Sequence, residues 1–245
     1  MTTALRCTPR RRLAMPMLFL LSMAAAPAEA RSNGPAIAEP MVFDLVRPLG
    51  ARRGEFEINT LAQRNVSGPD KAAHWAPEIE LAIADGFAVE LELPLSGMYV
   101  TDYKLGLQGT FGVFNGGKAI HGAQYLGLWN KEHRRWESSL LYIIGNRFGD
   151  RLSTLSMVGI GDVSSAGASE RSLLVNHTTF YDISEETVAG LEVNIRTGQQ
   201  RSTLIMPQIH RTLADRLDLQ AGLGAARARN DAWRPQIGMR LVREL

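Results

Sequence analysis

The sequence predicts an all-β protein: a single transmembrane up-and-down antiparallel β-barrel of about 12 strands. Three observations lead to this fold class. The 245-residue chain begins with a short apolar stretch typical of exported proteins. Apolar and polar residues then alternate along segments long enough to cross a bilayer as tilted strands. Short and long connections between these segments also alternate.

Residues 1–30 have the three regions of a secretory signal peptide. Arginines, among them Arg10 and Arg12, form the charged region, Leu13–Ala26 the apolar region, and Ala28-Glu29-Ala30 a small-x-small cleavage site. The apolar region is shorter than the roughly 20 residues that a spanning helix needs. We therefore expect export and cleavage after Ala30.

The rest of the chain has little net charge and no expected disulfide. Residues 1–30 hold four of the 27 basic and one of the 25 acidic residues, which leaves a net charge of −1 and no basic patch that would indicate nucleic acid. The single cysteine, Cys7, lies in the leader. Residues 31–50 are rich in Pro, Gly and Ala without a clear period, so we expect a periplasmic lead-in there and the barrel in residues 51–245.

The clearest element is a hairpin between His74 and Leu95. Every second residue is apolar up to Ile83 and again from Phe87 onward, and the tight turn Ala84-Asp85-Gly86 separates the two runs. The opposite face carries four carboxylates, Glu78, Glu80, Glu90 and Glu92. One apolar and one acidic face predict a pair of antiparallel strands.

Comparable segments follow to the end of the chain, and turn signals separate them. The twelve expected strands are Gly54–Gln63, Ala73–Ile83, Phe87–Leu95, Asp102–Phe114, Ala119–Trp129, Trp136–Gly145, Leu152–Gly161, Arg171–Asp182, Thr187–Arg196, Ser202–Leu213, Leu217–Ala226 and Trp233–Leu245. The alternation is poor in the fifth, seventh and eighth of these, where Tyr125, Ser156 and His177 blur the two faces.

The connections differ in length on the two sides of the expected barrel. Tight turns such as Asn115-Gly116-Gly117 follow the even-numbered strands, whereas longer loops such as Asp162–Glu170 follow the odd-numbered ones. In bacterial outer-membrane barrels the short turns are periplasmic. This asymmetry predicts that both termini are periplasmic.

The polar phase of the strands is expected to face the lumen, because it combines glycines with charges of both signs. Its expected luminal charged residues are Glu78, Glu80, Glu90, Glu92, Lys104, Glu192, Arg196, Asp218, Arg234 and Arg240. The four hairpin carboxylates allow two interpretations. They form either a cation-attracting wall or, as we favour, a salt-bridge network with Lys104, Arg196, Arg234 and Arg240 that plugs the barrel.

Aromatic residues gather where the expected strands meet the longer loops. These expected interface residues are Trp75, Tyr99, Tyr103, Trp129, Trp136 and Trp233. Aromatic rings with a polar tip prefer the boundary between lipid and water. The pattern predicts an aromatic girdle at one rim.

Three stretches, GEFEINTLAQRN, APEIELAIADGFAVELELPL and YKLGLQGTFGV, carry a resemblance to a known group. The region Gly54–Val113 resembles the outer-membrane transporter barrels grouped with the meta-pathway of phenol degradation. The resemblance implies a porin-like or solute-uptake channel in the outer membrane of a Gram-negative-type bacterium. Its partners would be outer-membrane lipid, the barrel-insertion machinery and a small-molecule solute. Such barrels usually end in an aromatic residue, whereas this chain ends in Leu245.

Other function classes find little support in the sequence. A structural or surface-interaction barrel with a plugged lumen is the main alternative. A bilayer-facing lipid hydrolase would use the stretch Asn176-His177-Thr178-Thr179, but no Gly-x-Ser-x-Gly elbow is present. The five histidines lack metal-ligand spacing. We therefore expect no catalytic residue, cofactor or metal.

Overall fold

The computed structural model of the chain describes residues 34–43, 45–69, 71–164 and 171–245. The expected signal peptide of residues 1–30 lies outside the described residues. No helix in the described part of the chain is long and apolar enough to cross a membrane.

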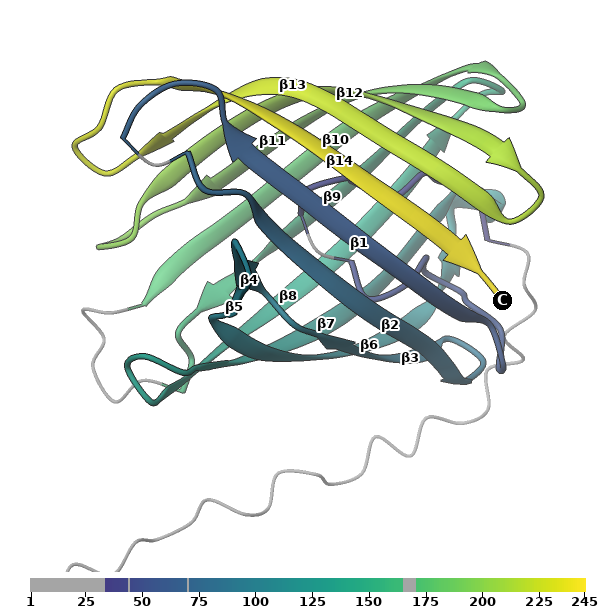
Figure 1. Cartoon of the computed structure of the whole chain (residues 1–245). Coiled ribbons are helices and arrows are strands. Elements are labelled where there is room, and N and C mark those ends of the chain that lie inside the picture. The colour runs from purple at the N-terminus through teal and green to yellow at the C-terminus, as the bar shows by residue number, and fades with distance from the viewer. Residues whose placement is uncertain (1–33, 44, 70, 165–170) are drawn as a thin grey trace, which may run out of the picture.

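The described strands form one closed antiparallel barrel (Figure 1). The wall consists of β1 (Phe56–Asn65), β2 (His74–Ala84), β3 (Phe87–Glu92), β6 (Asp102–Phe114), β7 (Ala119–Asn130), β8 (Arg135–Phe148), β9 (Leu152–Gly161), β10 (Ser172–Ser184), β11 (Thr187–Arg196), β12 (Ser202–Ala214), β13 (Leu217–Ala228) and β14 (Arg234–Glu244). Each pairs with its sequence neighbours, and β1 pairs with β14 to close the ring. The expected twelve-strand barrel is confirmed, and closure leaves no edge with unpaired backbone groups.

One expected strand is shorter in the structure. The third strand was expected to reach Leu95, but β3 ends at Glu92. Pro94 explains the break, because proline has no N–H to donate to the neighbouring strand. Two short strands, β4 (Leu95–Ser96) and β5 (Tyr99–Val100), then form a small hairpin within the expected loop.

The two ends of the barrel differ as expected. At the turn end, two residues join β2 to β3, β10 to β11 and β12 to β13, and the 3-10 turn η1 (Asn115–Gly117) lies between β6 and β7. Gly86 takes a positive φ of 70° in the first of these turns, a conformation that glycine adopts without strain. At the loop end the connections are longer, up to the ten residues 162–171 between β9 and β10.

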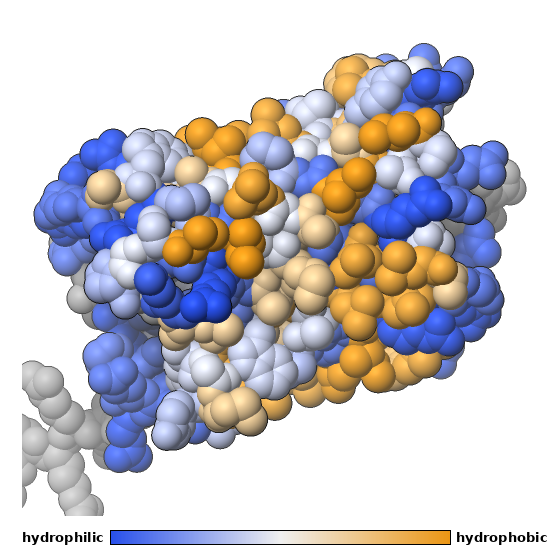
Figure 2. Space-filling model, turned by 45° about the horizontal axis from the view of Figure 1, so that its top comes forward, coloured by the Kyte–Doolittle hydropathy of each residue, from blue (hydrophilic) through white to orange (hydrophobic). Residues whose placement is uncertain are grey.

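The outer surface of the wall is an apolar belt. Large side chains on β2, β9, β12 and β14 alternate between the two faces, and those that point outward are about half exposed, as at Ile79, Val158, Ile209 and Met239. Figure 2 shows hydrophobic side chains spread across the wall between two ends where hydrophilic side chains gather. An apolar surface of this extent needs lipid or a partner to cover it.

A segment before β1 occupies the lumen. Residues 34–43 and 45–50, called the luminal segment below, were expected to form a periplasmic lead-in but lie inside the ring of strands (Figure 1). Both ends of the segment lie near the turn end, where Gly34 and Gly50 approach Ile120 of β7. Met41, near the middle of the segment, reaches the glycines Gly222 and Gly238 on the opposite wall. The segment therefore enters and leaves from the same side.

The luminal segment packs on an apolar inner wall. Leu45 joins buried residues of β8, β9 and β10, namely Leu141, Ile143, Leu155, Met157 and Phe180. Met41 packs on Leu204 and Met206 of β12. This packing explains part of the poor alternation of β9 and β10, because Leu155, Met157 and Phe180 are apolar and face inward. The polar residues Ser156 and His177 lie on the outward face of the same strands.

Candidate functional site: the occupied lumen

The other inner wall carries a buried acidic cluster of Glu57, Glu78, Glu80, Glu90 and Glu92. Neighbouring strands place like charges opposite one another, with Glu78 beside Glu92 and Glu80 beside Glu90. Glu80 and Glu90 are fully buried. Carboxylates packed this closely need cations or protons, because burial and mutual repulsion both disfavour their charged forms.

Arg240 of β14 is the main cation of this acidic cluster. Its Nη2 lies 2.7 Å from Glu78 Oε1 and 3.2 Å from Glu80 Oε1. Its Nε donates a 3.0 Å hydrogen bond to Asn59 Oδ1. The guanidinium therefore joins β1, β2 and β14 around the point where the barrel closes.

The luminal segment supplies the second cation, Arg47. Its Nη1 lies 2.5 Å from Glu57 Oε2 and 3.8 Å from Glu80 Oε2. Gln108 of β6 donates a 2.6 Å hydrogen bond to the Arg47 carbonyl. Arg47 was not among the luminal residues expected from the sequence; an arginine flanked by apolar residues, in Leu45-Val46-Arg47-Pro48-Leu49, was the signal that could have revealed it.

Lys104 of β6 is the third cation. Its Nζ lies 3.0 Å from Glu90 Oε1 and also pairs with Glu92. Oxygens of Glu78, Glu90 and Glu92 lie within 4.8 Å of one another, a spacing that a metal ion could use. The Lys104 ammonium lies against two of these three carboxylates and thus provides a tethered positive charge there.

Only part of the expected salt-bridge network is present. Lys104 and Arg240 join the acidic cluster, but Arg196 pairs with Asp162 at 3.3 Å and Arg234 with Asp231 at 2.7 Å, both at the loop end. The expectation that these two arginines join the network was wrong, because Arg196 is the last residue of β11 and Arg234 the first residue of β14, which places both at the rim. The described acidic cluster therefore has five carboxylates on strands and three cations.

The two remaining expected luminal residues also lie apart from the cluster. Asp218, near the turn end of β13, accepts a hydrogen bond from the Thr212 hydroxyl. Glu192 of β11 is fully buried and receives the luminal segment. Its two carboxylate oxygens accept hydrogen bonds from the backbone N–H groups of Met41 (3.1 Å), Val42 (3.0 Å) and Phe43 (2.6 Å).

Polar side chains of the wall complete this contact, which we call the Glu192 latch. Asn194 and Gln208 donate amide hydrogen bonds to the same carboxylate. Within the part of the chain that the structure describes, no lysine or arginine forms an ion pair with Glu192. Its charge is therefore balanced by oriented N–H groups, three of which belong to consecutive residues of the luminal segment.

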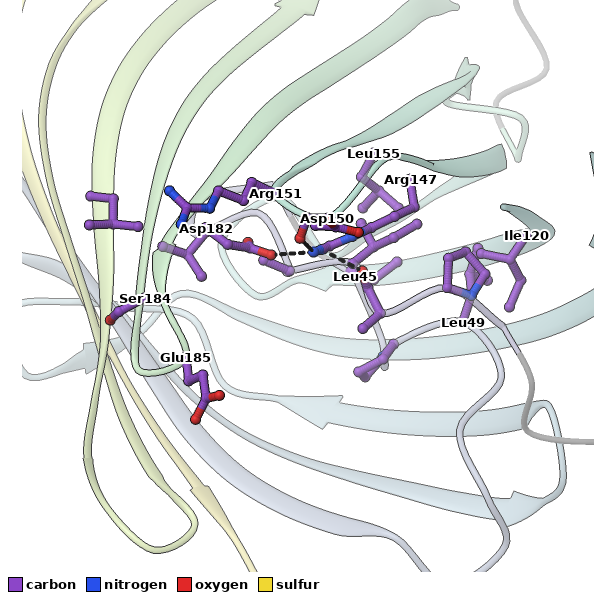
Figure 3. Close-up of a pocket in the computed structure, with 17 residues that line it drawn as sticks. Leu45, Leu49, Ile120, Arg147, Asp150, Arg151, Leu155, Asp182, Ser184 and Glu185 are labelled. Atoms are coloured by element: carbon purple, nitrogen blue, oxygen red, sulfur yellow. Dashed lines mark hydrogen bonds and ion pairs between the residues drawn. The ribbon is translucent and has the colours of Figure 1, made fainter. Parts of the chain in front are cut away.

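Two cavities lie on either side of the luminal segment. One of about 790 Å³ opens at the turn end between the segment and β7–β11. Figure 3 shows Arg147 extending across it toward Asp150 and Asp182. The other, of about 380 Å³, is lined by Glu78, Glu92 and Lys104 and by residues near the loop end. The lumen is thus hollow on both sides of the segment.

All six expected interface aromatics lie at the loop end. Trp75 donates a 2.6 Å hydrogen bond to the Gly97 carbonyl, and Lys131 lies 5.6 Å from the ring centre of Tyr103. A second group of aromatics, not expected from the sequence, lies near the turn end. It comprises the exposed residues Phe87, Phe114, Phe148 and Tyr181.

A polar trio interrupts the outer belt on β9 and β10. His177 Nδ1 lies 2.8 Å from Ser156 Oγ, and its Nε2 lies 3.1 Å from Thr179 Oγ1. The histidine and hydroxyl that a bilayer-facing hydrolase would need are therefore adjacent. Both strands carry these residues near their midpoints.

A closed barrel with an apolar belt, a charged lumen and unequal ends defines an outer-membrane β-barrel. A family model described as HAEPLYID-like matches residues 36–132, from the luminal segment to the connection after β7. Residues 37–44, IAEPMVFD, share four of the eight letters of that name in order. No curated protein sequence matches the chain.

Three solved structures have a similar fold. An outer membrane channel from Pseudomonas putida F1 is 15% identical with a TM-score of 0.63, and the match covers 83% of this chain and 100% of that one. The NanC porin is 7% identical over 78% of this chain and 100% of its own, with a TM-score of 0.61. The KdgM porin in complex with disordered oligogalacturonate is 9% identical over 75% and 97%, with a TM-score of 0.57. The resemblance expected from the sequence is confirmed at the level of the fold.

Proposed function

We propose that the chain is an outer-membrane channel for small solutes, exported with cleavage after Ala30, whose passage is closed by the luminal segment. The turn end is then periplasmic and the loop end extracellular. The observation that carries the proposal is the hollow lumen on both sides of one segment, which hydrogen bonds and packing hold across it. Displacing the segment would join the two cavities.

Planar bilayers test this proposal. We expect brief, discrete conductance steps from protein whose folding is shown by heat-modifiable gel mobility. Folded protein that never conducts, even with the luminal segment deleted, would instead support a structural or surface-interaction barrel.

The acidic cluster supports a preference of the open channel for cations. Its five carboxylates exceed its three cations, so mobile cations are attracted whenever the lumen fills with water. A measured reversal potential that indicates anion preference would contradict this expectation.

Glu90→Gln is expected to leave stability nearly unchanged. Lys104 keeps its pair with Glu92, and one of three crowded carboxylates loses its charge. We expect a change in the free energy of unfolding within about 1 kcal/mol, measured by urea titration with gel mobility as the readout. A fully compensated salt-bridge network, as favoured from the sequence, would instead give a loss of about 3 kcal/mol or more.

Opening is expected to depend on pH through Glu39, which lies in the luminal segment outside the strands. Burial raises the pKa of Glu39 to about 7, and the nearby Glu57 carboxylate adds to the rise, while Arg240 and Arg47 oppose it. The docked segment therefore disfavours the ionised carboxyl, and docking weakens as pH rises from the ordinary pKa of 4.5 through 7.

We expect a larger open fraction at about pH 8 than at about pH 5.5. Glu39→Gln should behave at both pH values as the protonated chain does. An unchanged pH response in Glu39→Gln would show that another group is responsible.

The polar trio on the outer belt does not support lipid hydrolysis. The hydrocarbon core is about 30 Å thick, so groups near its centre lie roughly 15 Å from the ester bonds of phospholipids. Ser156, His177 and Thr179 occupy the middle of β9 and β10. We expect no phospholipid hydrolysis in detergent assays, and hydrolysis that His177→Ala abolishes would contradict this.

A further inference from the structure

Arginines gather around one cavity at the loop end. A cavity of about 560 Å³ lies between the β11–β12 and β13–β14 connections, and Arg196, Arg201 and Arg227 line it together with the hydroxyls of Thr197, Ser202 and Thr203. None of its described lining residues is acidic. We call this site the arginine pocket.

Two guanidinium groups of the arginine pocket, those of Arg201 and Arg227, each donate a hydrogen bond to a neutral acceptor and keep further N–H donors for a ligand. Arg201 Nη2 donates to Asn230 Oδ1 at 3.1 Å, and Arg227 Nε donates to the Asp231 carbonyl at 3.2 Å. The Asp231 carboxylate itself pairs with Arg234, whose hydrogen bond holds the pKa of Asp231 below its ordinary value. Among the described residues, no carboxylate lies within ion-pair distance of Arg201 or Arg227.

The arginine pocket opens toward the outside of the barrel. Ile195, Thr203 and Arg227 are opposite one another on β11, β12 and β13 and share the outward face. Toward the turn end, that face presents Ile205, two residues from Thr203, and Leu223, four residues from Arg227, and both belong to the apolar belt. Arg227 therefore lies directly at the boundary between the belt and the loop end.

We propose that the arginine pocket binds the phosphate groups of an outer-leaflet glycolipid. The inference rests on the proposed outer-membrane location, which makes the loop end extracellular. Guanidinium groups bind phosphate through paired charge-assisted hydrogen bonds, and two arginines with only neutral partners are available for them. The position just above the apolar belt matches a headgroup whose acyl chains cover that belt. A soluble acidic solute has the same charge but no reason to bind on the outward face.

Lipid binding to purified full-length protein in detergent tests the proposal. The probes are bisphosphorylated lipid A, the same lipid without phosphates, and a soluble acidic trisaccharide, trigalacturonate. The Arg201→Gln/Arg227→Gln double variant is compared with Arg211→Gln/Arg243→Gln, which removes two outward arginines at the turn end. Heat-modifiable mobility confirms folding, and each single variant is available if the double variant misfolds.

We expect bisphosphorylated lipid A to bind the wild type and the turn-end variant equally, and the arginine-pocket variant at least about tenfold more weakly. The lipid without phosphates should bind the wild type as weakly as bisphosphorylated lipid A binds the arginine-pocket variant. Equal lipid A binding by all three proteins would overturn the proposal, as would arginine-dependent binding of trigalacturonate without binding of lipid A. Conductance should be the same in all three, so failure of the channel proposal would be detected separately.

Discussion

Glu192→Ala is expected to increase the open fraction of the channel by about two orders of magnitude. The change removes the acceptor of three backbone hydrogen bonds that hold the luminal segment. Hydrogen bonds to a charged group contribute roughly 1.5–3 kcal/mol each, and because such bonds are not additive we expect a net loss of about 3 kcal/mol in docking. Single-channel recording in planar bilayers measures the effect.

Glu186→Ala is the matched control, because Glu186 lies exposed in the β10–β11 turn of the same hairpin. It should conduct as the wild type does. If Glu192→Ala folds and its open fraction equals that of the wild type, the Glu192 latch does not hold the segment. The apolar contacts of Met41 and Leu45 and the ion pair of Arg47 with Glu57 would then have to hold it.

Arg240→Met is expected to destabilise the barrel by about 3–5 kcal/mol. The substitution leaves Glu78 and Glu80 buried without their main cation, and removing one member of a buried ion pair has a cost of this size. Urea unfolding followed by gel mobility gives the free energy. Arg234→Met, which breaks an ion pair at the loop end, should change it by less than about 1 kcal/mol.

A second substitution shows whether Arg240→Met destabilises the barrel through lost charge or through lost packing. Glu80→Gln added to Arg240→Met should recover part of the loss, because it removes one of the uncompensated charges. No recovery would mean that Arg240 acts through packing at the closure of the barrel rather than through its charge. A loss below about 1 kcal/mol in Arg240→Met itself would indicate that the acidic cluster is not charged in the folded state.

The strands with one polar and one apolar face could be predicted from the sequence. In β2, β3 and β14 the alternation predicts both the strand and the face that lies inside the barrel. The burial of Glu80, Glu90 and Arg240 agrees with the predicted face. The alternation of short and long connections predicts which end of the barrel carries the tight turns and which carries the loops. These features depend on local patterns that a single strand already contains.

The occupied lumen could not be predicted in the same way. The luminal segment has no period, because it follows the shape of the cavity instead of a regular backbone geometry. Apolar residues that pack on it, such as Ile143 and Phe180, face inward on β8–β10, which weakens the contrast between the two faces of these strands. Those inward apolar residues, in a lumen expected to be polar, were the available signal. One cation of the acidic cluster, Arg47, comes from the luminal segment, so it could not be predicted from the strands.

Closure by the luminal segment is tested most directly with a reversible tether. Val46 Cγ2 lies 2.6 Å from the position that a Cβ on Gly106 would take, so the two residues are in direct contact, and Val46→Cys with Gly106→Cys is the pair to oxidise. Cys7 lies in the expected leader, so the exported double variant would carry only these two thiols. Each single cysteine variant is the control.

The measurement is the conductance of the Val46→Cys/Gly106→Cys protein in one planar bilayer before and after reduction. The account predicts a silent oxidised protein that regains wild-type openings when the reductant is added, with no change in either single variant. Openings of equal frequency and size in the oxidised and reduced protein would contradict closure by the luminal segment.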